Sequence, residues 1–416
     1  MKRIISAIIL AALLCAMCAA LSSCGEDSGV TTLYVYNWGE YISDGSEDSL
    51  DSNEAFEEWY YDTFGEEVIV NYSTFSSNED LYAKLTSGAV AYDVIVPSDY
   101  MVERLINEDF LAPLDFENIP NIVNITSEFR GENAVYDYYD KGGIYSVPYM
   151  YGMVGVIYNT TMVDEDDEDI GSWSLLWDED YAGNILQFNN SRDAFGTAQY
   201  YLGINVNTDD EAEWRAALEK LREQKSVIQG YVMDEIYNKM ENGSAAVSSY
   251  YAGDFLTMYE ENEDLEFFYP KEGTNLYVDA MCIPKNCNNK LIAERSIDFM
   301  LSEEPAVANA EYTYYASPNT VVQESEEYRE YMDDIKEGGF ELMYNTGDVF
   351  TISYENLSEE KLALINSLWE ELKSDISVSG TIYIICAVII AAIAAIIVTK
   401  AVIRAKRKRC YNKYSG

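Results

Sequence analysis

The sequence predicts an α/β protein whose main body folds into two lobes. Strand-like and helix-like runs alternate along the chain, which is typical of a parallel sheet covered on both faces by helices. The body lies between two apolar terminal segments and contains only two cysteines, Cys282 and Cys287. Two cysteines cannot staple a body of about 350 residues, so it must rest on hydrophobic cores, and its length favours two lobes. Whether these cysteines form a disulfide stays open.

The first 23 residues have the pattern of a signal peptide. Lys2 and Arg3 precede an uncharged apolar run over residues 4–20, and Leu21-Ser22-Ser23-Cys24 resembles the bacterial lipobox. We therefore expect cleavage before Cys24 and acylation of its thiol. Residues 24–30 would then form an acylated linker.

The first part of the body follows a strand-helix-strand-helix-strand order. Residues 32–36, 67–72 and 92–96 read as strands. Residues 49–64 and 78–87 read as helices. Parallel sheets bind ligands beyond the carboxyl ends of their strands, where this sequence has polar groups at residues 37–41 and 98–100.

A second set of elements follows. The predicted strands lie at residues 155–159, 184–187, 245–248 and 265–268, with a long helix over 210–224. Residues 325–376 read as helical segments that close the body. Trp173 and Trp177 fit packing better than binding.

The C-terminal end predicts a membrane anchor. Residues 381–399 carry no charge, are rich in Ile, Ala and Val, and are long enough to span a bilayer. The basic tail at 400–416 is expected in the cytoplasm by the positive-inside rule, which places the body outside the cell membrane. The protein would then be anchored at both ends.

The composition suits a protein that holds a cation. The chain has 36 tyrosines, 73 acidic residues and no histidine, and residues 26–375 carry a formal charge of −55. Such a field attracts cations and repels nucleic acid, so nucleic-acid binding is excluded. Aromatic faces and carboxylates both bind ammonium groups. An acidic secreted protein with tyrosine in its core would share this composition, so particular residues must decide.

Seven segments carry a family resemblance. They lie, in order, at residues 33–41, 73–85, 92–100, 172–177, 269–273, 277–279 and 315–319. Leu33-Tyr34-Val35-Tyr36-Asn37-Trp38-Gly39-Glu40-Tyr41 looks like the opening of the spermidine/putrescine-binding receptors of polyamine ABC importers, and the other six continue the resemblance from about Thr31 to Ser374. The resemblance implies a two-lobed type II periplasmic-binding-protein-like fold, with a mostly parallel sheet in each lobe and a cleft that closes on the ligand.

The same resemblance implies the lobe boundaries and the partners. Lobe one would comprise residues 31–152 and 278–322, and lobe two residues 153–277 and 323–374. The protein would capture a polyamine outside the cell membrane and deliver it to the permease and ATPase subunits of an importer. It would be no enzyme, and no cofactor, metal or catalytic residue is expected.

The implied binding site has aromatic walls and carboxylates at its ends. Its members would be Trp38, Tyr41, Ser98, Tyr100, Asn190, Asp193, Tyr251, Asp254, Tyr277, Asp279 and Tyr315. The chemistry agrees, because a polyamine offers methylenes to aromatic faces and charged nitrogens to Asp and Tyr oxygens. Asp279 also lies in the apolar run 277–283, where a carboxylate needs a partner.

The sequence departs from the spermidine-type pattern in one place. Where that pattern has an acid followed three residues later by a glutamate, this chain has Asn190 and Asp193. Asp254 and Asp279 would hold one terminal ammonium and Asp193 the other, so we expect putrescine to bind comparably to or tighter than spermidine. The lack of histidine predicts little change in binding between about pH 6 and pH 8.

Two other functions use the same residues. The tyrosine doublets at 250–251 and 314–315 would suit a ferric-ion receptor with phenolate ligands, although such sites usually also contain histidine or bound anions. A secreted glycosidase would need a pair of carboxylates in a pocket. A thermal-shift screen with polyamines, ferric ion, amino acids and oligosaccharides would separate these functions.

Overall fold

The structure is a computed structural model that describes residues 30–374, except for residues 47–48, 132–133, 136, 345–346 and 348. The described residues up to Ile365 form one compact unit. The predicted signal peptide, Cys24, the span at 381–399 and the tail at 400–416 lie outside the described residues. Within the described ranges, no helix is long and apolar enough to cross a membrane.

The strands join edge to edge in the order β2-β1-β3-β9-β4-β7-β5-β6, with β8 paired to β4. Their bounds are β1 Thr31–Trp38, β2 Val68–Phe75, β3 Val94–Ile95, β4 Ser146–Asn159, β5 Ile185–Phe188, β6 Ile228–Val232, β7 Val247–Tyr251, β8 Leu265–Phe268 and β9 Leu276–Cys282. β4 joins two groups of strands, which we call lobe one and lobe two. Its first half pairs with β9 in the group with β1, β2 and β3, and its second half pairs with β7 and β8 in the group with β5 and β6.

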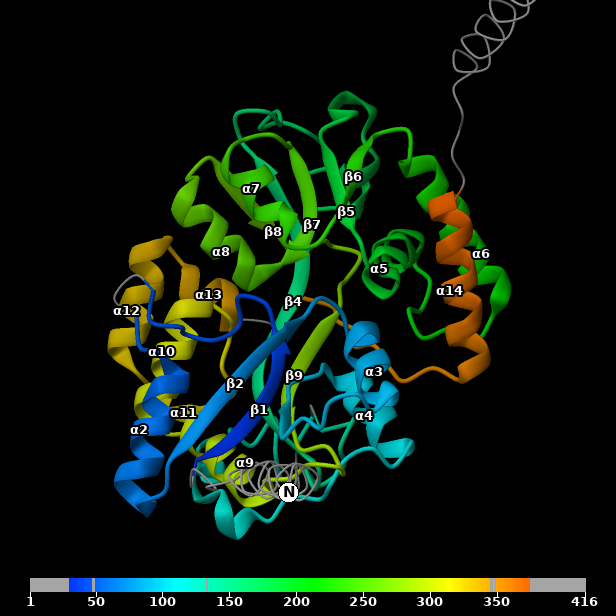
Figure 1. Cartoon of the computed structure of the whole chain (residues 1–416). Helices are drawn as coiled ribbons and strands as arrows, with labels where there is room; N and C mark the ends of the chain where they lie inside the picture. The colour runs from blue at the N-terminus through cyan, green and yellow to red at the C-terminus, as the bar shows by residue number, and fades with distance from the viewer. Residues whose placement is uncertain are drawn as a thin grey trace, which may run out of the picture. The chain divides into compact units, whose positions relative to one another are not determined.

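The helices cover these strands, with α2 on one side of the lobe-one strands and α3 and α4 on the other (Figure 1). Their bounds are α2 Ser52–Phe64, α3 Asn78–Ser87, α4 Asp99–Asn107, α5 Ser191–Leu202, α6 Glu211–Gln224, α7 Glu235–Glu241, α8 Ala252–Glu261, α9 Lys290–Met300, α10 Glu303–Thr313, α11 Thr320–Gln323, α12 Glu326–Ile335, α13 Gly339–Tyr344 and α14 Glu359–Ser374. The predicted helices at 49–64, 78–87 and 210–224 are confirmed, with ends shifted by three residues at most.

The sheet is mixed, so the prediction of a mostly parallel sheet in each lobe is wrong. β1 is parallel to β2 and β3, and β5 is parallel to β6 and β7. The other four pairings among the described strands, β3–β9, β4–β7, β4–β8 and β4–β9, are antiparallel. The reason is the connection between the lobes: β4 takes the chain into lobe two and β9 brings it back, so the two strands run in opposite directions.

Local signals in the sequence set the helix ends. The Asp51 side chain accepts hydrogen bonds from the backbone N–H of Asn53 and Glu54 at the start of α2, and Gly65 ends that helix in the left-handed conformation. Ser77 caps α3 through the N–H of Asp80. Side-chain oxygens at these positions satisfy backbone donors that have no partner inside the helix.

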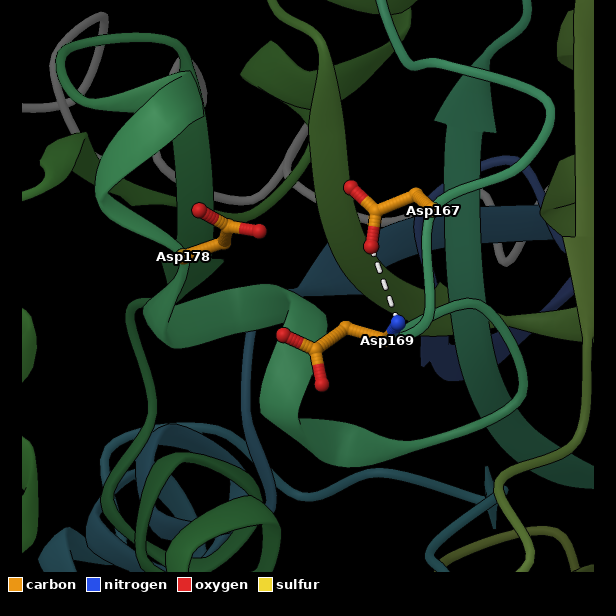
Figure 2. A group of neighbouring side chains, drawn as sticks. All are labelled: Asp167, Asp169 and Asp178. Carbon is orange, nitrogen blue, oxygen red and sulfur yellow. Dashed lines mark hydrogen bonds between the residues drawn. The ribbon is translucent and has the colours of Figure 1, made fainter.

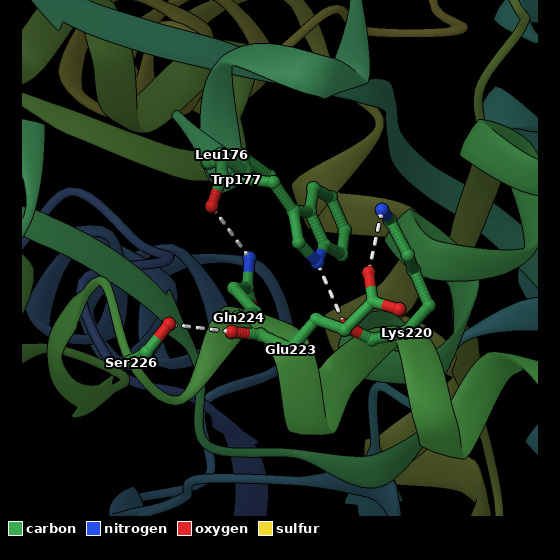
Figure 3. A network of polar contacts seen from close by, with 6 residues as sticks. All are labelled: Leu176, Trp177, Lys220, Glu223, Gln224 and Ser226. Atoms are coloured by element: carbon green, nitrogen blue, oxygen red, sulfur yellow. Dashed lines mark hydrogen bonds and ion pairs between the residues drawn. The ribbon is translucent and has the colours of Figure 1, made fainter. Parts of the chain in front are cut away.

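Trp173 and Trp177 pack lobe two, as predicted. Trp173 is fully buried, and its indole N–H donates to the Gly273 carbonyl at 2.8 Å. The Trp177 indole donates to the Lys220 carbonyl of α6 at 2.8 Å, next to the Lys220–Glu223 ion pair (Figure 3). The short helix at Trp173–Trp177 is thereby fixed against α6.

Cys282 and Cys287 are free thiols, which answers the question left open by the sequence. Cys282 is buried in β9. The Cys287 thiol instead donates to the Asp93 carboxylate at 3.1 Å.

Candidate ligand-binding site

A cleft between the two lobes contains all eleven predicted site residues. Its empty volume is about 860 Å³, which includes space open to solvent. The predicted residues among its lining are Trp38, Tyr41, Ser98, Tyr100, Asn190, Asp193, Tyr251, Asp254, Tyr277, Asp279 and Tyr315.

Strand-to-helix junctions build this cleft. Glu79, Asp99, Asp193 and Asp254 lie in the first turns of α3, α4, α5 and α8, and all four line the cleft. Helix N-termini carry partial positive charge and would repel a cation. The four acids reverse that sign, so the cleft presents negative charge.

Asp279 lies in the middle of the buried strand β9, where it is 4% exposed. Its carboxylate accepts hydrogen bonds from the Ser98 hydroxyl at 2.6 Å and the Tyr41 hydroxyl at 2.7 Å. Ser98 precedes α4 but makes no capping bond with its side chain, because its hydroxyl is directed to Asp279. Burial raises the pKa of Asp279 to about 6.

Asp254 is a second buried carboxylate, on α8 in lobe two. It accepts hydrogen bonds from the Tyr237 hydroxyl at 2.7 Å and the Tyr315 hydroxyl at 2.9 Å. Burial, with smaller contributions from the charges of Asp234 and Glu40, raises the pKa of Asp254 to about 7. This carboxylate is therefore partly protonated at neutral pH when no cation is present.

Asp193, on α5, is the third buried carboxylate. It accepts hydrogen bonds from the Tyr251 hydroxyl at 2.7 Å and from the side-chain amide of Asn190. The Asn190 carbonyl oxygen in turn caps α5 through the Asp193 N–H at 2.9 Å. Both polar groups of Asn190 are thus engaged, so its role is to position Asp193.

Charges within the cleft raise the pKa values of neighbouring groups. After burial, the charge of Asp193 also raises the pKa of Asp279. Burial, and after it the charges of Asp279 and Asp254, raise the pKa of Tyr277. The three aspartates therefore belong to one connected acidic site.

Aromatic rings form the walls between the acids. The Tyr41 and Tyr315 rings meet edge to face at 4.8 Å, and those of Tyr251 and Tyr277 at 5.4 Å. Trp38 lies 4.5 Å from the Phe75 ring. Such walls suit methylene groups and cations.

Two residues with unusual backbone conformations, Glu40 and Tyr314, precede tyrosines of the cleft walls and direct them into the cleft. Glu40, in the loop after β1, has a φ of 49°, and Tyr41 follows it. Tyr314 ends α10 with a φ of 58°, in the left-handed region that favours glycine, and Tyr315 follows it into the cleft. Non-glycine residues in this region cluster at functional sites.

Within the described part of the chain, none of Asp193, Asp254 and Asp279 forms an ion pair with Lys or Arg. The positive charge of Arg192 acts on the neighbouring Asp193 without such a contact. Two buried polar atoms of the cleft, the Trp38 indole nitrogen and the Asn275 carbonyl oxygen, also lack a hydrogen-bond partner in that part of the chain. Buried charges and polar groups left in this way call for a ligand.

The sequence missed several residues of the cleft. Glu79, Asp99, Arg192 and Tyr237 line it beside the predicted residues. The Tyr138 hydroxyl donates to Asp99, whose pKa is raised to about 7 by burial. A signal existed for the acids, because each follows a predicted strand at a helix start.

The tyrosine doublets do not form a phenolate cluster. Tyr315 faces the cleft, whereas the Tyr314 hydroxyl donates to Glu260 at 2.9 Å in another groove. Burial also raises the pKa of Tyr250, Tyr251 and Tyr315 well above the ordinary value, and the Tyr251 and Tyr315 hydroxyls donate hydrogen bonds to Asp193 and Asp254. The geometry favours the cation-binding prediction over a ferric site.

Another group of carboxylates lies outside this cleft (Figure 2). Oxygens of Asp167, Asp169 and Asp178 lie within 4.8 Å of one another. The Tyr181 hydroxyl donates to Asp167 at 2.5 Å and the Ser174 hydroxyl to Asp169 at 2.5 Å. These bonds account for the cluster as local loop structure.

Two lobes that enclose an acidic, aromatic cleft define the class: this is a solute-binding protein with a site for a cation. Residues 54–334 match the family described as bacterial extracellular solute-binding proteins, and the chain belongs to that family.

Curated relatives and solved structures agree with this assignment. The chain is 32% identical to the spermidine/putrescine-binding periplasmic protein of Salmonella typhimurium over 298 residues, which cover 71% of this chain and 80% of the relative. It is 30% identical to the putrescine/cadaverine-binding protein of Pseudomonas aeruginosa, covering 68% of this chain and 77% of the relative. A structure of a putative spermidine/putrescine ABC transporter from Listeria monocytogenes superposes with a TM-score of 0.71 at 32% identity, covering 83% of this chain and 99% of that one.

Proposed function

We propose that the protein is an extracytoplasmic receptor that captures a polyamine, putrescine or spermidine, in the cleft and delivers it to the permease and ATPase of an ABC importer. The named ligands of the relatives support this ligand class. The protein acts as a receptor and not as an enzyme, in keeping with its family.

The observation that carries the proposal is the set of three buried aspartates. Each accepts hydrogen bonds from tyrosine, serine or asparagine, and each lacks an ion-pair partner among the described residues. One ammonium group would lie at Asp254, with Tyr237 and Tyr315. The other would lie at Asp279 and Asp193. The tyrosine walls between them would hold the methylene chain.

The test is a thermal-shift screen of the purified protein. Putrescine and spermidine are expected to raise the melting temperature, because a ligand that binds only the folded state stabilises it by mass action. Amino acids, oligosaccharides and ferric ion should produce no shift. A shift with ferric ion and none with any polyamine would contradict the proposal.

The two ammonium positions predict the ligand preference. A diamine satisfies Asp254 at one end and Asp279 with Asp193 at the other, whereas the third ammonium of spermidine would find Asn190 engaged with Asp193. We therefore expect putrescine to bind comparably to or tighter than spermidine in a competition titration. Spermidine binding more than tenfold tighter, about 1.4 kcal/mol, would refute this preference.

Gly253 keeps Tyr315 in place. A Cβ at Gly253 would lie 2.3–2.8 Å from ring atoms of Tyr315, whose hydroxyl donates to Asp254. Gly253→Ala should displace the ring and weaken putrescine binding by about 1.5–3 kcal/mol, the usual contribution of a hydrogen bond to a charged group, because Asp254 loses the Tyr315 hydroxyl. Gly230→Ala is the matched control, since a Cβ there meets nothing within 4 Å. Equal affinities of both variants in calorimetry would show that Tyr315 is not needed.

The domain boundaries and anchors complete the proposal. Lobe one would comprise residues 31–152 and 278–322, and lobe two residues 153–277 and 323–374. The boundary between residues 152 and 153 falls within β4, and the boundary between residues 277 and 278 falls within β9. These two strands connect the lobes. A lipid on Cys24 and a membrane span at 381–399 would hold the receptor at the outer face of the cell membrane.

A further inference from the structure

Arg192 is a buried cation inside a cleft built for cations. It is 4% exposed, and its guanidinium carbon lies 4.5 Å from the centre of the Tyr354 ring. One nitrogen, Nη2, donates to the Asn207 side chain at 3.2 Å. Nε and Nη1 are buried without a hydrogen-bond partner among the described residues. An unsatisfied buried guanidinium is costly, so this arrangement needs a purpose.

Glu79 is the anion that faces Arg192 from the other lobe. It begins α3 in lobe one, lines the same cleft and is half-buried. Its carboxylate accepts a long hydrogen bond, 3.2 Å, from the Tyr100 hydroxyl, and it forms no ion pair within the described part of the chain. Burial raises the pKa of Glu79, while the positive charge of Arg192 acts against that rise.

Tyr100 lies between the two charges. The Arg192 guanidinium carbon is 5.7 Å from the centre of the Tyr100 ring, whose hydroxyl holds Glu79. Arg192 on α5 belongs to lobe two, whereas Tyr100 and Glu79 on α4 and α3 belong to lobe one. The Tyr100 ring and hydroxyl thus connect the guanidinium to the carboxylate, while no ion pair joins the two among the described residues.

We propose that Arg192 and Glu79 form an ion pair across the cleft when the lobes close on a ligand. The idea rests on the proposed polyamine-binding function and adds the contact that holds the closed state. Closure gives the unpartnered N–H groups of Arg192 a charge-assisted acceptor. It also neutralises the arginine, so that a cationic ligand is not repelled. Arg192 is thus a positioning residue that need not touch the ligand.

The kinetic test uses Arg192→Gln, Glu79→Gln and the double variant of the full chain, with putrescine and spermidine as probes in stopped-flow fluorescence. Each single variant should release both ligands about tenfold faster with little change in association, because the pair acts in the closed state. The double variant should be no faster than either single variant, since residues that form one contact are not additive.

Arg215→Gln is the matched control. Arg215 is an exposed arginine of α6 that pairs with Glu211 at 2.7 Å on the surface, so its loss should leave release unchanged. Effects of Arg192→Gln and Glu79→Gln that multiply to about a hundredfold would overturn the pair, because independent contacts add in free energy. So would tighter spermidine binding by Arg192→Gln alone, which would mean that Arg192 merely repels a third ammonium.

A cross-linking test does not depend on which ligand binds. In the Glu79→Cys/Arg192→Cys variant, a short bis-thiol cross-linker that spans the length of an Arg–Glu ion pair should join the two thiols of the ligand-free protein faster than in Glu79→Cys/Arg215→Cys, since a direct disulfide would be too short. Putrescine should accelerate the reaction further. If the wild type binds no polyamine, the proposed function fails, yet cross-linking still supports the approach of the two residues. Absence of cross-linking in a folded variant overturns the pair.

Discussion

Asp279→Asn is expected to weaken putrescine binding by about 2–5 kcal/mol, because it removes one partner of a buried charge pair. The carboxylate is 4% exposed and is held by the Ser98 and Tyr41 hydroxyls. An amide cannot neutralise an ammonium, and its NH₂ group would face hydroxyls that now donate. Calorimetric titration of the variant measures the loss directly.

Asp298→Asn is the matched control. Asp298 is also a buried aspartate, 6% exposed, but it accepts a hydrogen bond from the Asn121 N–H at 2.7 Å and is not among the residues of the cleft. This substitution should lower stability and leave affinity unchanged. If Asp279→Asn binds putrescine with wild-type affinity, Asp279 is not part of the site. If both variants lose putrescine affinity to a similar extent, the loss reflects a general effect on folding.

Putrescine affinity is expected to fall as the pH is lowered from 8 to 5.5. The ligand stays protonated, as alkyl ammonium groups have pKa values near that of lysine, about 10.4. Asp254, with a pKa of about 7, and Asp279, with a pKa of about 6, must lose their protons to pair with it. Protonation of both acids should raise the dissociation constant for putrescine about a hundredfold between pH 8 and pH 5.5. The raised pKa values of these buried acids thus predict a pH dependence that the lack of histidine alone did not suggest.

The same pKa values predict the opposite pH dependence for the stability of the ligand-free protein, which should fall as the pH rises. The folded pKa of Asp254 and Asp279 lies above the unfolded value of about 3.9, so the folded state binds more protons between these values. Their contribution to the stability of the ligand-free protein is present at low pH and is lost as the pH rises through about 6 to 7. Putrescine should consequently shift the melting temperature more at pH 8 than at pH 5.5. Equal shifts would show that neither acid meets the ligand.

Much of the fold could be predicted from the sequence, because many of its helices and strands carry local sequence signals. The Asp51 cap and the left-handed Gly65 mark the ends of α2, and the runs at 32–36 and 67–72 became β1 and β2. β9 was harder. Its residues are buried throughout, so it has no alternation of polar and apolar side chains and reads only as an apolar run. The antiparallel pairings follow from how β4 and β9 connect the lobes, which no local pattern encodes.

The site was predicted from resemblance more than from chemistry. The eleven predicted residues come from six stretches of the chain that only the fold brings to one cleft. Arg192 and Glu79 were not predicted as site residues, because a basic or acidic residue in the first turn of a helix usually reads as ordinary surface charge. Only burial and the missing partners of Arg192 distinguish it.

The central claim is that the three buried aspartates hold a polyamine, and calorimetric titration of the purified full chain with putrescine and spermidine at pH 7.5 tests it most directly. Ligand carried over from the cells must first be removed by reversible unfolding and dialysis. The account predicts saturable binding of one ligand per chain with a dissociation constant in the micromolar range or tighter, about −8 kcal/mol. No heat and no competition with either polyamine, from protein that is folded and binds another solute, would contradict it.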